Sequence, residues 1–184
     1  MNKTIAGALC AGLIAIGNAG GALAGAYDTF QEMIGGSDFP PVTNERYRAE
    51  CGGCHLAFPP RLLTAAAWRD MIGKLKNHFG DDGTLAPAVT KELLDYLVAN
   101  AAQWNIQDHT PFAVSSGSAN DGPPRITETF FFTTRHSRRV SLQEVKANRK
   151  VGSFANCAAC HPNADKGNFS DHEVAIPGKS KPHD

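Results

Sequence analysis

The sequence has no excess of charge of either sign. Its 184 residues include 18 lysine and arginine residues and 18 aspartate and glutamate residues, so the formal net charge at pH 7 is zero. A protein that binds nucleic acid normally carries a basic patch and a positive net charge, because it must neutralise phosphates. The charge balance therefore argues against nucleic acid as a partner.

A convincing β-strand pattern is also absent. No segment alternates apolar and polar residues over the length of a half-buried strand, and the best candidate for an extended segment is Thr129-Phe130-Phe131-Phe132-Thr133. Apolar residues instead recur at spacings of three and four, which is typical of amphipathic helices. Thr43 is the expected N-cap of the first helix and Gly80 the expected C-cap of the second. Three helices are expected, over residues 44–50, 65–79 and 87–101.

Beyond the N-terminus, no apolar run is long enough to cross a membrane. The chain starts with a cationic tip at Lys3 and an apolar run from Ile5 to about Ile16. Ala22-Leu23-Ala24 then has the form that signal peptidase recognises, and Ala24-Gly25-Ala26 is a second option. The run is too short and too rich in glycine for a membrane anchor. We expect residues 1–24 to be a cleaved signal peptide and the mature chain to reside in the periplasm.

Cysteine is scarce, with five residues in all. Cys10 lies in the leader and should leave with it, and Leu9 before it is not the small residue that a lipidation site needs. The other four form two copies of one motif, Cys51-Gly52-Gly53-Cys54-His55 and Cys157-Ala158-Ala159-Cys160-His161. Cys-x-x-Cys-His is the attachment signature of a c-type haem. The two thiols form thioethers with one porphyrin, and the histidine is the proximal ligand of its iron.

Other uses of paired cysteines fit the pattern less well. Zinc-binding pairs usually lie closer together than these two, which are about a hundred residues apart. A thioredoxin-type pair is expected at a strand-to-helix turn, and no such context is present. Disulfides do not need a histidine after each pair. We therefore expect two covalently attached haem c groups, which in bacteria are attached outside the cytoplasmic membrane.

The mature chain divides into two parts of unequal design. Residues 25–108 place helices around the first motif, and residues 126–184 surround the second motif with most of their length before it. Residues 109–125 are rich in Ser, Gly, Pro and Asp, which is typical of a linker or long loop. The expected architecture is two small cytochrome c-like haem domains with long loops.

The sixth ligand of the first iron must come from elsewhere in the chain. His78 follows Met71 by seven residues and Leu75 by three, so on a helix it shares their apolar stripe. An imidazole on such a face beside a haem needs a partner, and iron is the obvious one. Met71 is the rival ligand, since a thioether also binds haem iron. The alternative for His78 and for Met71 is that the residue belongs to the hydrophobic core and does not bind iron.

For the second iron, we favour His136, which precedes Cys157 by twenty-one residues and follows three phenylalanines that can line a porphyrin. His172 is the main alternative, although its neighbours Asp171 and Glu173 suggest a surface position. Two more histidines lie in less suitable segments, His109 in the linker and His183 in the C-terminal tail. An open iron is the remaining alternative.

Four segments carry a resemblance to a known family. They are Tyr47 to His55, Trp68 to Gly80, Arg125 to Thr129, and Asn156 to His161 followed by Ala164, Gly167 and Phe169. Together they span most of the mature chain, which is similar to the bacterial dihaem cytochrome c (DHC) family. The Cys-x-x-Cys-His motifs are common to all c-type cytochromes, and His78-Phe79-Gly80 and the Arg125 segment are more specific. Family members tend to carry proline and tryptophan where this chain has Phe130-Phe131-Phe132.

The resemblance implies two domains, each with one bis-histidine haem, and electron transfer in the periplasm. It also implies redox partners such as a small oxygen-binding monohaem cytochrome c and a b-type membrane cytochrome. Bis-histidine iron changes little in geometry between its two oxidation states, which favours fast electron transfer, and should have a lower potential than His/Met iron. No residue then acts as acid, base or nucleophile. The competing function is a dihaem peroxidase or small-molecule reductase with one open iron.

Overall fold

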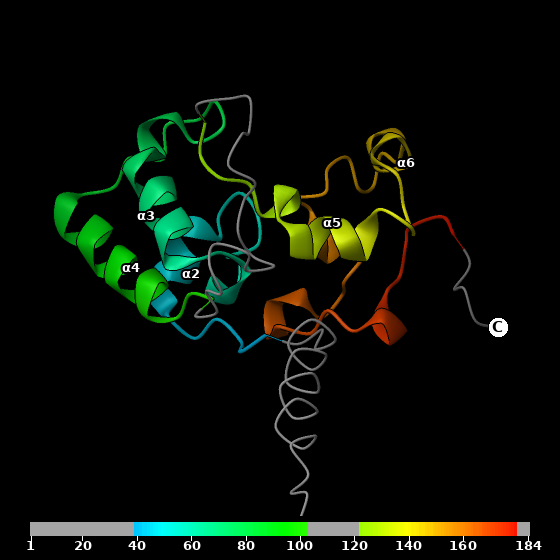
Figure 1. The fold of residues 1–184 in the computed structure, drawn as a ribbon, viewed down its shortest axis with the longest axis horizontal. Helices are drawn as coiled ribbons and strands as arrows, with labels where there is room; N and C mark the ends of the chain where they lie inside the picture. The colour runs from blue at the N-terminus through cyan, green and yellow to red at the C-terminus, as the bar shows by residue number, and fades with distance from the viewer. Residues whose placement is uncertain (1–38, 103–121, 180–184) are drawn as a thin grey trace, which may run out of the picture. The chain divides into compact units, whose positions relative to one another are not determined.

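The computed structural model describes residues 39–102 and 122–179, and all of these lie in one compact unit (Figure 1). In these ranges the chain is mainly helical and forms no sheet, which confirms the predicted fold class. Short 3-10 turns connect the α-helices. The α-helices are α2 (Glu45–Cys51), α3 (Ala65–Gly73), α4 (Pro87–Ala99), α5 (Phe130–His136) and α6 (Leu142–Ala147).

Helix α2 ends on the first cysteine of the first motif. Its N-cap is Asn44, whose side chain accepts a hydrogen bond from the Tyr47 N–H at 2.8 Å, so the prediction of Thr43 as the cap is wrong by one residue. Gly52 follows the helix, and its N–H donates to the Arg48 carbonyl at 2.9 Å. A Cβ at Gly52 would lie 2.3 Å from that carbonyl oxygen. The tight exit from α2 therefore requires glycine directly after Cys51.

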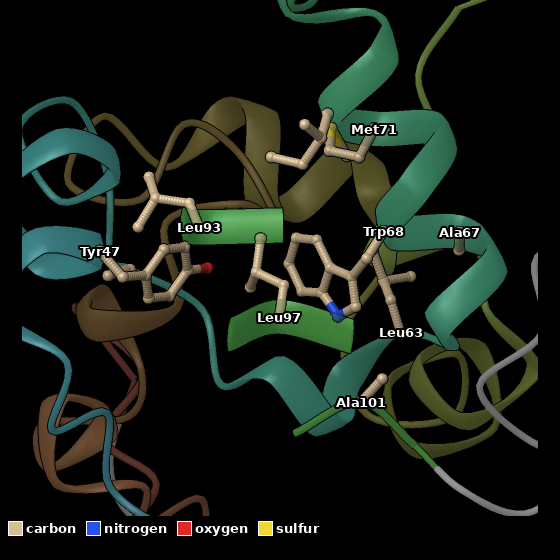
Figure 2. Close-up of a cluster of buried hydrophobic side chains, with 10 residues drawn as sticks. Tyr47, Leu63, Ala67, Trp68, Met71, Leu93, Leu97 and Ala101 are labelled. Carbon is tan, nitrogen blue, oxygen red and sulfur yellow. The ribbon is translucent and has the colours of Figure 1, made fainter. Parts of the chain in front are cut away.

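The main hydrophobic core lies between α3 and α4, which pack side by side (Figures 1 and 2). Leu63, Leu93 and Leu97 are completely buried there. Figure 2 shows Trp68 among them, and its indole N–H donates to the Pro60 carbonyl at 2.7 Å. A buried leucine contributes about 2 kcal/mol through removal of its surface from water. The core thus holds α3, and with it the segment that leads to His78, against α4.

Helix α3 is shorter than the pattern predicted. It ends at Gly73, and the N–H of Lys74 donates to two carbonyls of the last turn, those of Asp70 and Met71. Residues 75–77 form a 3-10 turn, so the predicted helix over 65–79 and the predicted cap at Gly80 are wrong. Helix α4 begins at Pro87 as expected and ends at Ala99, two residues early.

Residues 130–133 belong to α5, so the expectation that residues 129–133 could be extended is wrong except at Thr129, the N-cap, whose backbone is extended. Thr129 is completely buried and caps α5, with its hydroxyl accepting from the Phe132 N–H at 3.2 Å and donating to the Ile126 carbonyl at 2.8 Å. An N-cap of this kind is strong enough to start a helix in a run of phenylalanines, whose own helix propensity is modest.

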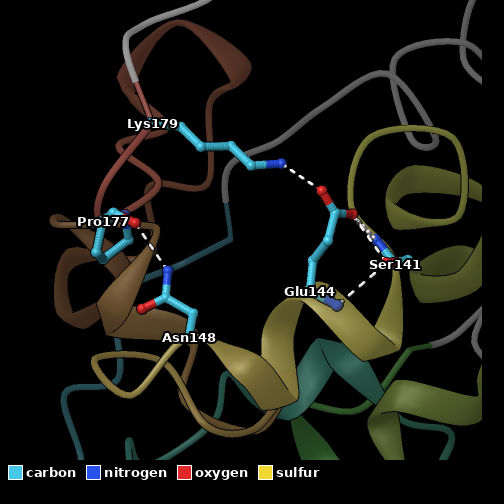
Figure 3. A network of polar contacts seen from close by, with 5 residues as sticks. All are labelled: Ser141, Glu144, Asn148, Pro177 and Lys179. Carbon is cyan, nitrogen blue, oxygen red and sulfur yellow. Dashed lines mark hydrogen bonds and ion pairs between the residues drawn. The ribbon is translucent and has the colours of Figure 1, made fainter.

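The C-terminal segment is tied to α6 (Figure 3). Ser141 and Glu144 form a capping box, and the Glu144 carboxylate also accepts from Lys179 at 2.6 Å. The side-chain amide of Asn148 donates to the Pro177 carbonyl at 2.7 Å. Between these contacts and the second motif, the Ala175 N–H donates to the Cys160 carbonyl at 2.8 Å.

Phe39 joins the start of the described chain to the region after the second motif. Its N–H donates to the Gly167 carbonyl at 2.8 Å, and its ring makes edge contacts with Phe131 and Phe169 at centroid distances of 5.8 and 5.6 Å. Residues 1–38 and most of the predicted linker over 109–125 lie outside the described residues. The signal peptide and the division into two domains therefore stay predictions. No helix among the residues that the structure describes is long and apolar enough to span a membrane.

Candidate haem sites

At the first motif, the ring of His55 is held by the chain that follows it. Its Nδ1 lies 2.7 Å from the Leu56 carbonyl oxygen, and its ring stacks on Phe58 at 4.7 Å between centroids. Because a carbonyl oxygen can only accept, Nδ1 must carry the hydrogen. The lone pair is then on Nε2, which is the arrangement that a metal-binding histidine needs.

His78 faces His55 across a short gap. The two ring centroids are 6.1 Å apart, with an angle of 32° between the ring planes. His78 lies after the 3-10 turn rather than on the helical stripe with Met71 and Leu75 that the sequence suggested. Its Nδ1 is buried and has no hydrogen-bond partner. Burial and the nearby His55 lower the pKa of His78, so the neutral imidazole with a free lone pair is favoured.

At the second motif, His161 faces His136, the last residue of α5. Their ring centroids are 6.2 Å apart, with 74° between the planes. The Nδ1 of His136 donates to the Phe132 carbonyl at 2.8 Å, which again leaves Nε2 free, and the ring stacks on Phe132 at 3.9 Å. Burial lowers the pKa of His136, and burial with the nearby His136 lowers that of His161 to about 4.

The separations suit two imidazoles on opposite sides of one iron. An imidazole nitrogen binds a first-row metal at about 2 Å, and its ring centre lies about 1 Å further away, so two opposed ligands place their ring centres roughly 6 Å apart. Both pairs have this spacing, and each lies beside a Cys-x-x-Cys motif. The buried, unpaired Nδ1 of His161 is another polar atom that lacks a protein partner. The residues present therefore fit two haem groups.

The rival ligands lie elsewhere. Met71 is buried in the core with Trp68, where it is 7% exposed, and His172 lies exposed in a 3-10 turn. His109 and His183 are outside the described residues. Over residues 39–102 and 122–179, no three His, Cys, Asp or Glu side chains are grouped so as to hold a metal ion. A structural zinc site needs four such ligands, whereas a porphyrin needs only two from the protein.

The two motifs border one cavity of about 370 Å³. Burial raises the pKa of the thiols of Cys51 and Cys157 to about 11, so both are neutral before they react with haem. Residues of both attachment motifs contribute to the lining of the cavity. It is lined by Cys54, His55, Leu56, Ser153, Ala155, Asn156, Cys157 and Ala158.

The sequence analysis missed the aromatic residues that pack on the histidines. Phe58 contacts His55, Phe154 contacts His136 at 5.8 Å, and Phe169 contacts His161 at 5.2 Å. Phe58 and Phe154 each lie three residues from a motif, and this proximity was a usable signal. Phe132 precedes His136 by four residues, which identifies it as a neighbour once α5 is known to be a helix.

Comparison with known proteins identifies the family of the chain. The family model described as dihaem cytochrome c, DHC, matches residues 47–169. The X-ray structure of a diheme cytochrome type c from Shewanella baltica OS155, sb-DHC, is 40% identical with a TM-score of 0.62, covering 75% of this chain and 96% of that one. No curated protein matches the chain.

Two structures from Rhodobacter sphaeroides are also similar. The structure of DHC purified from that organism is 39% identical, with a TM-score of 0.55, and covers 70% of this chain and 99% of that one. A diheme cytochrome c from the same organism is 37% identical, with a TM-score of 0.57, and covers 71% and 99%. With its two Cys-x-x-Cys-His motifs and its match over residues 47–169, the chain belongs to the dihaem cytochrome c family and carries two covalently attached haem c groups.

Proposed function

We propose that this protein is a periplasmic electron carrier in which His55 with His78, and His136 with His161, ligate the two haem irons. The observation that carries the proposal is the spacing of the two facing pairs, 6.1 and 6.2 Å between ring centroids. With two imidazoles on each iron, neither coordination sphere has a vacant position. That arrangement suits electron transfer rather than binding of a small molecule.

When bound, each haem supplies an iron that takes up and releases one electron. The chain's own task is to hold the four imidazoles in fixed orientations, so that little rearranges when the charge changes. Hydrogen bonds from Nδ1 fix His55 and His136, and Phe58 and Phe132 stack on those rings and keep water away. No acid, base or nucleophile takes part, because the protein positions and tunes the cofactor.

Passage of an electron between the two haems is supported by the cavity that both motifs line. Cys54 to Leu56 border the same space as Ser153 and Ala155 to Ala158, so the two attachment points belong to one site. The donor and acceptor are redox proteins, and we propose an oxygen-binding monohaem cytochrome c and a b-type membrane cytochrome as the partners. The signal peptide over residues 1–24, the domains over 25–108 and 126–184, and the linker over 109–125 are part of the same proposal.

Separate alanine variants of His78 and His136 test the ligation. Each should convert one haem, and only one, from low-spin to high-spin, because a ligand is lost on one side of that iron. His172→Ala is the matched control, since this histidine is exposed and lies eleven residues after His161 of the second motif. Optical and EPR spectra report the spin states. Low-spin iron at both haems in His136→Ala, with high-spin iron in His172→Ala, would refute the assignment of the second site.

A further inference from the structure

The turn that carries His78 has an unusual backbone. His78 and Asp81 exchange two backbone hydrogen bonds, of 2.8 and 3.2 Å, which close a tight turn around Phe79 and Gly80. Phe79 has a φ of +57°, a left-handed conformation that a bulky residue rarely adopts. Its ring is 39% exposed and contacts the His78 ring at 4.8 Å between centroids. Such a conformation persists only where other contacts hold it.

One such contact comes from Arg125. Its guanidinium carbon lies 4.0 Å from the centre of the Phe79 ring, which is the geometry of a cation–π interaction. Arg125 is itself fixed by the 3-10 turn that follows it, in which the Glu128 N–H donates to the Arg125 carbonyl at 3.0 Å. The Glu128 carboxylate also lies 3.6 Å from the guanidinium.

The segment around Arg125 is anchored at two other points. Ile126 packs against the main core and against a smaller cluster of Phe39 and Leu62, and the Lys74 ammonium donates to the Gly122 carbonyl at 3.2 Å. These contacts hold the backbone on either side of Arg125 beside the His78 turn. The Arg125 side chain is 48% exposed, and its contacts with Phe79 and Glu128 hold the guanidinium there.

We propose that Arg125 is a positioning residue for His78 and raises the reduction potential of the haem that His55 and His78 ligate. This inference rests on the proposed ligation by His78. The contacts of 4.0 and 4.8 Å keep the guanidinium carbon within about 9 Å of the centre of the His78 ring. That distance is comparable with the Debye length of about 10 Å at 0.1 M salt, so the charge is not fully screened.

The sign of the effect follows from the charges. Ferric haem carries one more positive charge than ferrous haem, so a nearby cation disfavours the ferric form and raises the potential. Glu128 opposes this effect, because its carboxylate partly neutralises Arg125. Removal of either partner should therefore shift the same potential in opposite directions.

A redox titration of the full dihaem protein tests the proposal. Arg125→Leu should change the ratio of reduced to oxidised iron at one haem about threefold, which corresponds to a potential lower by about 30 mV for one electron. Arg125→Lys should retain most of the original value, and Glu128→Gln should raise it. Lys91→Gln is the control, because it removes an exposed, paired cation from α4 and should move neither potential. The shifted haem is identified as the one that His78→Ala converts to high-spin.

The outcomes separate this proposal from the one on which it rests. If His78→Ala makes one haem high-spin but Arg125→Leu moves neither potential, the role of Arg125 is refuted and the ligation stands. If His78→Ala leaves both haems low-spin, the ligation itself fails. Should Arg125→Leu fail to incorporate haem, Glu128→Gln decides: a rise at the same haem supports the proposal, and an unchanged potential overturns it.

Discussion

At the scale of single residues, the four histidines fall into two kinds. His55 and His136 donate from Nδ1 to a backbone carbonyl, whereas the Nδ1 atoms of His78 and His161 are buried without a partner. Each facing pair contains one of each kind. A hydrogen bond from Nδ1 fixes the orientation of the ring and makes its Nε2 more basic. Under the proposed ligation, each haem would have one ligand whose ring is oriented by a hydrogen bond and one whose ring is oriented by packing alone. At the second motif, the ligand without the hydrogen bond is the motif histidine, His161.

Gly167 offers a test of how the region after the second motif meets Phe39. Gly167 has a φ of +80°, and an added Cβ would lie 2.0 Å from the Phe39 carbonyl oxygen. Gly167→Ala should lower the free energy of unfolding by more than the roughly 1–2 kcal/mol that a left-handed conformation costs an ordinary residue. Gly178 has nearly the same φ, +82°, but open space around it. Gly178→Ala should therefore lower the free energy of unfolding only by the cost of the left-handed backbone conformation. Equal melting temperatures for the two variants would contradict this description of the contact.

Single residues also show what the sequence could and could not predict about the site. The four motif cysteines and their histidines follow from spacing alone, because covalent attachment demands that spacing. His136 was a good candidate because aromatic residues precede it and because His172 lies among charges. His78 was predicted because it would share an apolar face with Met71 and Leu75 on a continuous helix, but that helix ends before Leu75. The structure brings it opposite His55 through a turn with a left-handed Phe79, which no periodicity could indicate.

At the scale of elements, the helices of the second part are short and depend on their caps. Helix α5 has 7 residues and α6 has 6, well below the length at which an isolated helix is stable. Thr129 and Ser141 cap them, and each cap accepts a hydrogen bond from the first turn. Because α5 ends on His136, its N-cap also sets where this proposed ligand lies. Neither α5 nor α6 was predicted. Among the predicted helices the starts of α3 and α4 were right at residues 65 and 87, whereas α3 ends at Gly73 and not at residue 79, because helix ends depend on contacts distant in sequence.

Glu144 connects α6 to the C-terminal segment and should make this contact sensitive to acid. Hydrogen bonds from Lys179 and Ser141 lower the pKa of Glu144 from 4.5 to about 2. Because the folded pKa is the lower one, the contact contributes fully above about pH 4.5 and is lost as the pH falls towards 2. We therefore expect the protection of the Ala175 amide hydrogen against exchange to fall over this pH range, and Glu144→Gln should abolish that pH dependence.

Lys179→Met is the companion variant for this experiment, since it removes the other partner and leaves the capping box intact. It should also speed exchange at Ala175 near neutral pH, without weakening α6. An acid dependence that persists unchanged in Glu144→Gln would show that another group controls the segment.

At the scale of the whole molecule, residues 39–102 and residues 122–179 belong to one compact unit. Phe39 contacts Gly167, Phe131 and Phe169, and Ile126 packs on the core that α3 and α4 form. The sequence suggested two separate parts because the motifs lie far apart and the composition changes between them. Contacts between distant segments leave no periodic pattern, so the joining residues could not be found from spacing.

The arrangement of the whole molecule also bears on the choice between the two functions. A carrier needs both irons closed, while a peroxidase or reductase needs one that a small molecule can reach. The chain supplies a facing histidine for each motif histidine, and both motifs line one cavity. These features support the proposed path for electrons from one haem to the other, in which neither iron is open to a small molecule.

The most direct test of this account is an optical spectrum of the reduced protein before and after addition of carbon monoxide. With two imidazoles on each iron, the account predicts that the Soret and visible bands of both haems stay unchanged on the time scale of mixing. Rapid binding of carbon monoxide at either haem would contradict it, because that iron would then have an open or easily displaced sixth position.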